Sequence, residues 1–191
     1  MTTFTIFGTG SMATAIASVL TKGGATVEHI GSQDKDAAVN GSVAILAVPY
    51  PALADISQQY GEKLAGKVVV DISNPLNFET FDSLVVPADG SAAAELAAAL
   101  PSSTVLKAFN TNFAATLTDQ SVGPNRTTVM VAGDDEAAKQ QLVAAVQAGG
   151  LKAVDAGALK RARELESLGF VQLTLAAGEK IPWNAGFALV H

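Results

Sequence analysis

Short apolar runs alternate with helical segments along the chain, and this alternation limits the folds that it can form. The apolar runs cover residues 3–7, 26–30, 42–48, 67–72, 105–109, 127–132 and 151–154. Helical segments lie between or after them, at residues 11–22, 51–60, 91–100, 134–148 and 158–177. Apolar strands separated by helices indicate a parallel sheet covered on both faces. We therefore predict an α/β protein with a Rossmann-type, doubly wound, mostly parallel sheet.

One connection is shorter than this fold usually has. After the second run and the Gly31-Ser-Gln33 segment that ends it, only residues 34–41 remain before the third run begins at residue 42. A crossover helix followed by another strand needs a dozen residues or more, so it does not fit there. We expect a sheet that is trimmed in its first half.

Gly8 and Gly10 stand between the first strand and the first helix, in the segment Thr5-Ile-Phe-Gly-Thr-Gly-Ser-Met-Ala13. In this context Gly8 permits a tight turn, Gly10 lets the backbone approach a pyrophosphate, and Ala13 allows close packing of helix on strand. The unpaired N–H groups and the dipole at the helix start favour an anion. The motif predicts a dinucleotide site formed by Gly8, Thr9, Gly10, Ser11 and Met12.

The end of the second strand bears on which dinucleotide binds. NAD enzymes usually carry an acid there, about 20 residues beyond the turn, which binds the ribose 2′-hydroxyl. Here the strand ends Ile30-Gly-Ser-Gln-Asp-Lys35, with no acid at the critical point. Ser32 and Gln33 can donate hydrogen bonds to a 2′-phosphate, and Lys35 adds positive charge. We expect NADP as the cofactor and consider NAD less favoured.

Three further segments follow strand ends, on the edge where open α/β sheets bind ligands. They are Val48-Pro-Tyr50, Ser73-Asn-Pro75 and Phe109-Asn-Thr-Asn112. Proline and asparagine are also ordinary turn residues, but their joint placement beside Gly8 favours contact with the cofactor. The candidates are Val48, Pro49, Tyr50, Asn74, Pro75 and Asn110. Lys107 precedes this edge and is expected to face away from it.

Composition excludes several classes of protein. The net charge of −6 opposes nucleic-acid binding, which needs clustered Lys and Arg. The absence of cysteine removes disulfides, thiolate metal sites and a cysteine nucleophile. No apolar run approaches the ~20 residues of a membrane span, so a cytoplasmic location is expected. The acids of Gly133-Asp-Asp-Glu136 open a helix, where we read them as caps, and no metal is expected.

The C-terminal part, residues 157–191, is expected to add a helix and a tail to a dinucleotide-binding part formed by residues 1–156, all within one compact domain. The helix carries apolar side chains at Leu159, Leu165, Leu168, Val171 and Leu175, and an apolar tail follows. A small domain cannot easily cover both, so this region predicts a homodimer interface and a cover for the active site. Its charged residues are expected on a solvated face: Arg161, Arg163, Glu164 and Glu166.

These motifs resemble the deazaflavin-dependent NADP reductases, small proteins that pass hydride between NADP and a deazaflavin coenzyme. The resemblance covers nearly the whole chain. It is carried by Phe7–Gly10, Gly31-Ser32, Ala47–Pro49, Gly133–Asp135, Asp155–Gly157 and Glu166–Leu168. The cytosolic domains of membrane ferric reductases look similar too.

The resemblance implies roles for several segments. The backbone from Thr9 to Met12 would bind pyrophosphate, and Ser32 with its successor would bind the 2′-phosphate. The segments 48–50 and 110–114 would lie beside the nicotinamide, which adds Ala114 to the candidate site, and Ala47 joins it as the first residue of the Ala47–Pro49 motif. Two positions depart from the family pattern: Gln33 replaces an arginine, and Asn110-Thr-Asn-Phe113 replaces a His-Thr-Ile-Pro segment beside the deazaflavin.

The leading hypothesis is therefore an NADP(H)-dependent oxidoreductase that transfers hydride to a small ring acceptor, a flavin or a deazaflavin. The predicted edge offers amides and hydroxyls but no group that titrates near neutral pH, so we expect no catalytic acid or base. One alternative is a non-catalytic NADP-binding sensor or regulatory domain. Another is the cofactor half of a two-domain dehydrogenase such as pyrroline-carboxylate reductase, but the helical substrate domain of those enzymes is absent.

Overall fold

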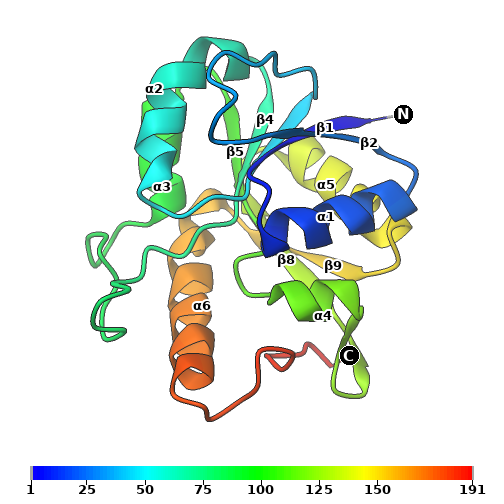
Figure 1. Cartoon of the computed structure of the whole chain (residues 1–191), viewed down its shortest axis with the longest axis vertical. Coiled ribbons are helices and arrows are strands. Elements are labelled where there is room, and N and C mark those ends of the chain that lie inside the picture. Colours follow the sequence, from blue (N-terminus) through cyan, green and yellow to red (C-terminus); the bar gives the residue numbers. More distant parts are fainter. Residues whose placement is uncertain (1, 191) are drawn as a thin grey trace.

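The structure is a computed structural model that describes residues 2–190, so Met1 and His191, the outermost residues of the two expected regions, lie outside it. Its main sheet has seven strands in the order β2-β1-β3-β4-β5-β8-β9 (Figure 1). The strands are β1 (Thr3–Phe7), β2 (Thr26–Ile30), β3 (Val43–Leu46), β4 (Val68–Asp71), β5 (Thr104–Lys107), β8 (Thr128–Gly133) and β9 (Lys152–Gly157). The helices are α1 (Ser11–Lys22), α2 (Ala52–Leu64), α3 (Ala92–Ala99), α4 (Ala114–Thr118), α5 (Glu136–Ala148) and α6 (Ala162–Ala177).

The sheet is mostly parallel, as predicted. Strands β2, β1, β3, β4 and β5 pair in parallel. Strand β8 pairs antiparallel with β5, and β9 pairs parallel with β8. A short hairpin, β6 (Ser121–Val122) with β7 (Asn125–Arg126), precedes β8 and was not predicted. The carboxyl ends of β1 to β5 therefore meet at one edge, where the candidate segments follow them.

The structure also confirms that the first half of the sheet is trimmed. Strands β2 and β3 lie on either side of β1, and residues 31–42 connect them without a helix. This connection crosses closely over β1, since a Cβ on Gly41 would lie 2.6 Å from the Thr5 nitrogen. The Gly41 N–H donates to Thr5 Oγ1 at 2.9 Å. Glycine at this position lets a short loop replace a helix-strand unit.

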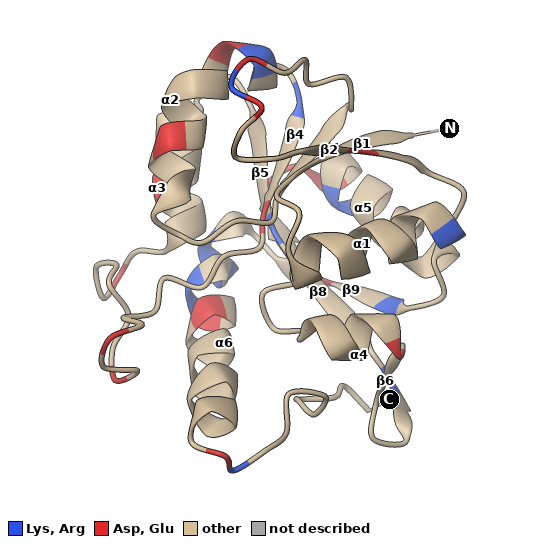
Figure 2. Ribbon diagram, viewed as in Figure 1, with Lys and Arg blue, Asp and Glu red and all other residues tan. Residues whose placement is uncertain are grey.

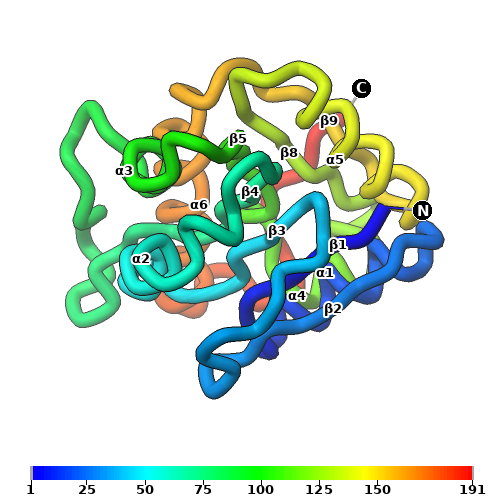
Figure 3. The backbone as a smooth tube through the Cα atoms, turned by 90° about the horizontal axis from the view of Figure 1, so that it is seen from above, coloured from blue at the N-terminus to red at the C-terminus, as the bar shows by residue number. Residues whose placement is uncertain are grey.

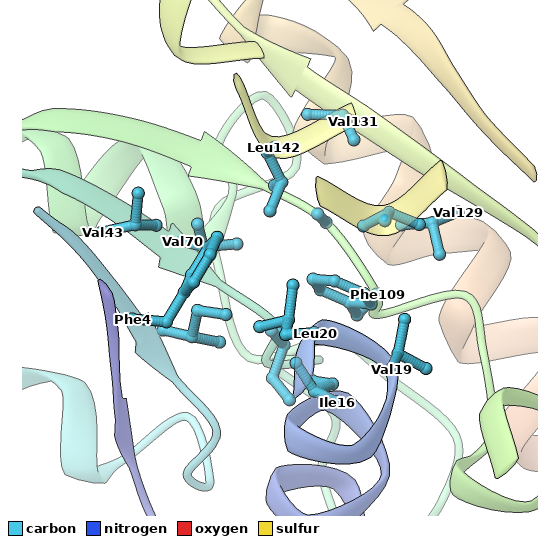
Figure 4. Close-up of a cluster of buried hydrophobic side chains, with 14 of the residues drawn as sticks. Phe4, Ile16, Val19, Leu20, Val43, Val70, Phe109, Val129, Val131 and Leu142 are labelled. Atoms are coloured by element: carbon cyan, nitrogen blue, oxygen red, sulfur yellow. The ribbon is translucent and has the colours of Figure 1, made fainter. Parts of the chain in front are cut away.

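Two helical layers cover the sheet, as the view from above shows (Figure 3). Alternate strand residues such as Phe4 and Ile6 face α1 and α5, where they join Ile16, Leu20 and Leu142 in one buried cluster. Figure 4 shows Phe4, Ile16, Leu20 and Leu142 among the side chains of this cluster. The other strand faces pack against α2 and α3 in a second buried cluster. The continuous apolar strands follow from burial on both faces.

The predicted C-terminal helix begins with a 3₁₀ turn, Leu159–Arg161, before α6. Arg161, Arg163 and Glu164 have half-exposed side chains, as expected. The expectation for Glu166 is wrong, because this residue is fully buried. A buried ammonium group stabilises it there, as described below. The half of α6 beyond Glu166 carries no charge and is uniformly tan in Figure 2.

The acidic segment before α5 caps that helix, as the sequence indicated. The Asp135 carboxylate accepts a hydrogen bond from the Ala138 N–H at 2.8 Å, and Asp134 accepts one from Leu159 at 2.9 Å. Within residues 2–190 no helix is both long and apolar enough to cross a membrane.

Candidate functional site

Gly8 ends β1 in a turn that only glycine forms easily. Its φ is +111°, and a Cβ would overlap the carbonyl oxygen of Ala47, the residue that follows β3. The Gly8 N–H donates to the Ile30 carbonyl at 2.8 Å, and the Ala47 N–H donates to the Phe7 carbonyl at 2.9 Å. The turn therefore holds the ends of β1, β2 and β3 together.

The start of α1 leaves its backbone donors free. Gly10 is the N-cap, and no side chain of the described residues caps the helix. The Thr14 N–H makes a helical bond to the Gly10 carbonyl, and the first turn contains no acid. A Cβ on Gly10 would find no atom of residues 2–190 within 4 Å. Glycine is thus not needed here for packing, which fits a group that approaches the backbone from outside, as a pyrophosphate does.

Three adjoining clefts run along this edge. Cleft A, of about 460 Å³, lies between the Gly8 turn and α2. Cleft B, of about 390 Å³, lies between the start of α1 and the segments after β3 and β4. Cleft C, of about 420 Å³, lies between α1, the segment after β5 and the C-terminal tail. Clefts A and B share Gly10 and residues 47–49, whereas B and C share Ser11, Met12, Ile72, Asn74 and Leu173.

Cleft A combines an apolar wall with a few charges. Phe7, Ile30, Ile56 and the Tyr60 ring contribute the wall. The Tyr60 hydroxyl donates to the Asp34 carbonyl, which fixes the loop after β2 against α2. Lys35, Asp34 and Asp55 are the charged residues that line the cleft. Asp34 Oδ2 accepts a hydrogen bond from the Gly31 N–H at 2.8 Å, so this carboxylate oxygen is engaged within the turn after β2.

Tyr50 borders cleft B and is held by α3. Its hydroxyl donates to Glu95 Oε2 at 2.6 Å. This hydrogen bond is the main reason that the pKa of Tyr50 is raised, to about 12. Tyr50 therefore stays a neutral phenol at ordinary pH and is not available as a base.

Two asparagines join the ends of β4 and β5 under clefts B and C. Asn74 Nδ2 donates to the Asn110 carbonyl at 2.8 Å, and Asn110 Nδ2 donates to Asn74 Oδ1 at 2.9 Å. Asn110 Nδ2 also donates to the Leu165 carbonyl on α6 at 2.8 Å. Three buried oxygens that belong to cleft-lining residues have no hydrogen-bond partner within residues 2–190: Ser73 Oγ, Asn110 Oδ1 and Asn112 Oδ1.

Such orphaned atoms are costly unless a ligand satisfies them. These unpartnered oxygens and the open space at Gly10 fit a dinucleotide. Its pyrophosphate would meet the start of α1, and the polar substituent of its nicotinamide ring would reach the ends of β4 and β5.

The structure brings most of the predicted site residues to these clefts. Cleft A receives Gly8, Thr9, Gly10, Ser32, Lys35, Ala47, Val48 and Pro49. Cleft B adds Ser11, Met12, Tyr50 and Asn74, and cleft C adds Asn110 and Ala114. Gln33 and Pro75 line none of the three clefts. Lys107 lines none of them either and is completely buried behind the edge.

Other lining residues escaped sequence reasoning. Ile56, Gln59 and Tyr60 recur at helical spacing on α2, a signal that could have placed that face at cleft A. Phe78 and Leu173 come from the long loop after β4 and from α6. Trp183 lies in the C-terminal tail, the region that we expected to cover the active site, and it lines cleft C. The Trp183 ring packs on Phe113 with centroids 5.0 Å apart. No local pattern indicates that these distant segments meet.

Comparison with known proteins gives a relative that the chain matches over most of its length. The chain is 36% identical over 154 residues to the F420-dependent NADP reductase of Methanocaldococcus jannaschii, which covers 78% of this chain and 69% of the relative. It is 34% identical over 140 residues to the metalloreductase STEAP3 of Rattus norvegicus, covering 73% of this chain and 26% of that protein. No family model matches the chain.

The fold agrees with a solved structure. A protein of Arthrobacter sp. FB24, provisionally assigned as an F420-dependent NADP reductase, superposes with a TM-score of 0.85 over 100% of both chains, at 23% identity. This likeness supports the Rossmann-type architecture, and the Methanocaldococcus relative supplies the family. The chain belongs to the family of F420-dependent NADP reductases.

Proposed function

We propose that this oxidoreductase binds NADP(H) along clefts A and B and passes hydride to or from a deazaflavin ring in cleft C. The observation that supports this most strongly is the sharing of Ser11, Met12, Ile72, Asn74 and Leu173 by clefts B and C. Two flat rings in adjoining clefts with a common wall can approach to contact distance. NADP(H) would supply the hydride-carrying nicotinamide ring.

The protein's own residues would bind and orient. In this proposal, the N–H groups at the start of α1 bind the pyrophosphate, and Ser32 and Lys35 bind the 2′-phosphate. The loop residues 47–50 and Asn74 would line the nicotinamide. Catalysis would rest on holding the rings in place, because Tyr50 is kept neutral and no histidine within residues 2–190 lines the three clefts.

Turnover with defined acceptors tests this proposal. Purified protein should oxidise NADPH in the presence of coenzyme F420, with FMN as the comparison acceptor. Faster turnover with FMN would move the acceptor assignment from deazaflavin to flavin. No turnover with either ring, together with tight NADPH binding, would favour the non-catalytic sensor instead.

Cofactor preference is a separate part of the proposal. Ser32 and Lys35 favour NADPH, and we expect its Kd to be lower than that of NADH. Gln33 does not itself line cleft A, but it lies between the lining residues Ser32 and Asp34, and the longer arginine side chain would extend toward the phosphate. Gln33→Arg should therefore strengthen NADPH binding by ~1–3 kcal/mol through charge-assisted hydrogen bonds. Fluorescence titration with both cofactors decides this, and equal or tighter NADH binding would contradict it. Asp34 and Asp55 in the same cleft are the groups that would then explain the result.

We also propose that the protein forms a homodimer. Val171 on the uncharged half of α6 and the tail residues Trp183, Phe187 and Leu189 are large apolar side chains between 40% and 54% exposed. Apolar surface gathered on one helix and its tail favours a subunit interface. Light scattering should give twice the mass of the chain, and a monomer at micromolar concentration would reject the dimer.

A further inference from the structure

Asp71, Lys107 and Glu166 form a buried ion cluster behind the ring clefts. All three side chains are fully buried. Lys107 Nζ lies 2.8 Å from Asp71 Oδ2 and 2.8 Å from Glu166 Oε1, and it donates to the Ser73 carbonyl at 2.6 Å. The three N–H donors of the ammonium group are thus all used.

The cluster joins four elements. Asp71 ends β4, Lys107 ends β5, and the two are register partners in the sheet. Glu166 lies on α6 and also accepts hydrogen bonds from the Ala92 and Ala93 N–H groups at the start of α3. Two carboxylates share one ammonium, so the cluster carries excess negative charge when all three groups are ionised.

Such a cluster is a poor way to gain stability alone. Desolvating three charges costs several kcal/mol per ion, and apolar residues of similar volume often stabilise a core equally well. Its distinctive effect here is on Ser73. The Ser73 N–H donates to Asp71 Oδ1 at 2.7 Å, while the Ser73 carbonyl accepts from Lys107. Charged groups therefore hold the backbone of this residue on both sides.

The side chain of Ser73 is left free by this arrangement. Ser73 lines cleft B, is 4% exposed, and its Oγ has no partner within residues 2–190. A buried hydroxyl held without a partner loses hydrogen bonds that water would give it. The hydroxyl can donate to a carbonyl oxygen or accept from an amide N–H, and a carboxamide offers both.

We propose that Ser73 Oγ binds the carboxamide of the nicotinamide ring, and that Asp71, Lys107 and Glu166 are positioning residues that aim it. This rests on the proposed function only in requiring that NADP(H) occupies clefts A and B. It assigns no role to the acceptor.

Calorimetry on Ser73→Ala tests the first half. The ligands are NADPH and 2′-phospho-ADP-ribose, which lacks the nicotinamide. One lost hydrogen bond should weaken NADPH binding about 2- to 10-fold and leave the affinity for the fragment unchanged. Unchanged NADPH affinity, or an equal loss for both ligands, overturns the assignment. If the wild-type protein binds neither ligand, the proposed function itself fails.

A double-mutant cycle tests the positioning half. Glu166→Gln keeps the size of the side chain and removes its charge. If it acts through Ser73, it should weaken NADPH relative to the fragment in the wild-type background and have no further effect in Ser73→Ala. Additive losses, or no loss in the wild-type background, overturn the positioning role.

Lys107→Met is the stronger variant, and it leaves two carboxylates buried without a cation. Lys139→Met is its matched control, because Lys139 is 7% exposed and pairs with Asp155 away from the three clefts. The ratio of the two ligand affinities should change in Lys107→Met and not in Lys139→Met. A shift of equal size in both variants would overturn the proposal. If Lys107→Met does not fold, the Glu166→Gln cycle decides alone.

Discussion

At the scale of single residues, Gly8 and Gly10 serve different purposes although they belong to one motif. We predict that Gly10→Ala still folds and loses only the N-cap preference for glycine over alanine, on the order of 1 kcal/mol, because its Cβ would meet no atom of residues 2–190 within 4 Å. It should nevertheless weaken NADPH binding, on the order of tenfold or more, by overlapping the ligand. Gly8→Ala should lower the free energy of unfolding by ~1–3 kcal/mol, through its positive φ and the Ala47 carbonyl. Thermal melting and calorimetry on both variants separate the two effects.

Glu166 makes stability depend on pH in an unusual direction. Burial raises the pKa of its carboxyl above the ordinary value of 4.5, although Lys107 and the Ala92 N–H oppose the shift. A raised folded-state pKa gives a contribution that is full below the unfolded pKa and is lost as pH rises through the folded pKa. Glu166→Gln removes this titration. Relative to wild type, its free energy of unfolding should therefore improve as pH rises from the ordinary glutamate value through the raised pKa of the folded state.

Urea unfolding at several pH values measures this difference. Glu164→Gln, a half-exposed carboxylate on the same helix, is the control and should run parallel to wild type. A difference between Glu166→Gln and wild type that shrinks or stays constant with rising pH would contradict the assignment.

The glycine turn could be predicted from the sequence but the ion cluster could not, and the difference has a physical reason. The Gly8 and Gly10 signals are local, because strand, turn and helix follow each other along the chain. Glu166 follows two arginines and another glutamate on a helix, a pattern typical of a solvated face. Its burial depends on Lys107, which lies on a strand distant in sequence. Polar residues that stabilise each other in the interior leave no periodic signal.

At the scale of elements, the contact of α6 with the strand ends depends on Gly169. A Cβ there would overlap Asn74 Oδ1 and lie 3.0 Å from the Asn110 carbonyl oxygen. Gly-to-Ala substitution inside a helix usually stabilises by ~0.5–1 kcal/mol. We predict the opposite for Gly169→Ala: a loss of ~1–3 kcal/mol from overpacking, with slower hydride transfer because the asparagine pair shifts.

Gly61 on α2 supplies the matched comparison. Its Cβ would lie 3.6 Å from Leu100 Cδ2, an ordinary contact, so Gly61→Ala should show the usual stabilisation. Urea unfolding and turnover of the two variants test this pair. Stabilisation by Gly169→Ala would mean that α6 packs less tightly on the asparagines than the structure shows.

Elements that are bounded by clear turn signals were predictable, whereas the short helix and the hairpin between β5 and β8 were not. The bounds of β1, α1 and β2 match the predicted ranges, because each is an uninterrupted pattern between glycine turns. The five-residue α4 and the hairpin β6–β7 are too short for a period to develop. The reversed direction of β8 follows from this segment, since α4 and the hairpin turn the chain between β5 and β8.

At the scale of the whole molecule, cleft C is lined by parts of the chain that lie far apart in sequence. Ser11 and Met12 begin α1, Phe113 follows β5, and Trp183 lies in the tail that runs from α6 back toward α4 (Figure 1). The predicted edge of the sheet thus gives only the floor of cleft C. Its outer wall depends on the tail, which we expected to cover the active site, but no strand or helix pattern indicates the path that the tail takes.

This arrangement predicts that a change at one tail residue weakens binding of the acceptor without weakening binding of NADPH. Trp183 lines cleft C and packs on Phe113, but it does not line clefts A or B. Trp183→Ala should raise the KM for coenzyme F420 about three- to tenfold, through lost ring contact, and leave the Kd of NADPH unchanged. Trp183→Phe should retain most of the affinity.

Phe187→Ala is the control, because Phe187 is a 44% exposed tail ring that lines none of the clefts. Since Trp183 is the single tryptophan, its fluorescence should also be quenched when the acceptor binds. Equal losses for NADPH and acceptor, or no change in either, would mean that the tail does not form the acceptor wall.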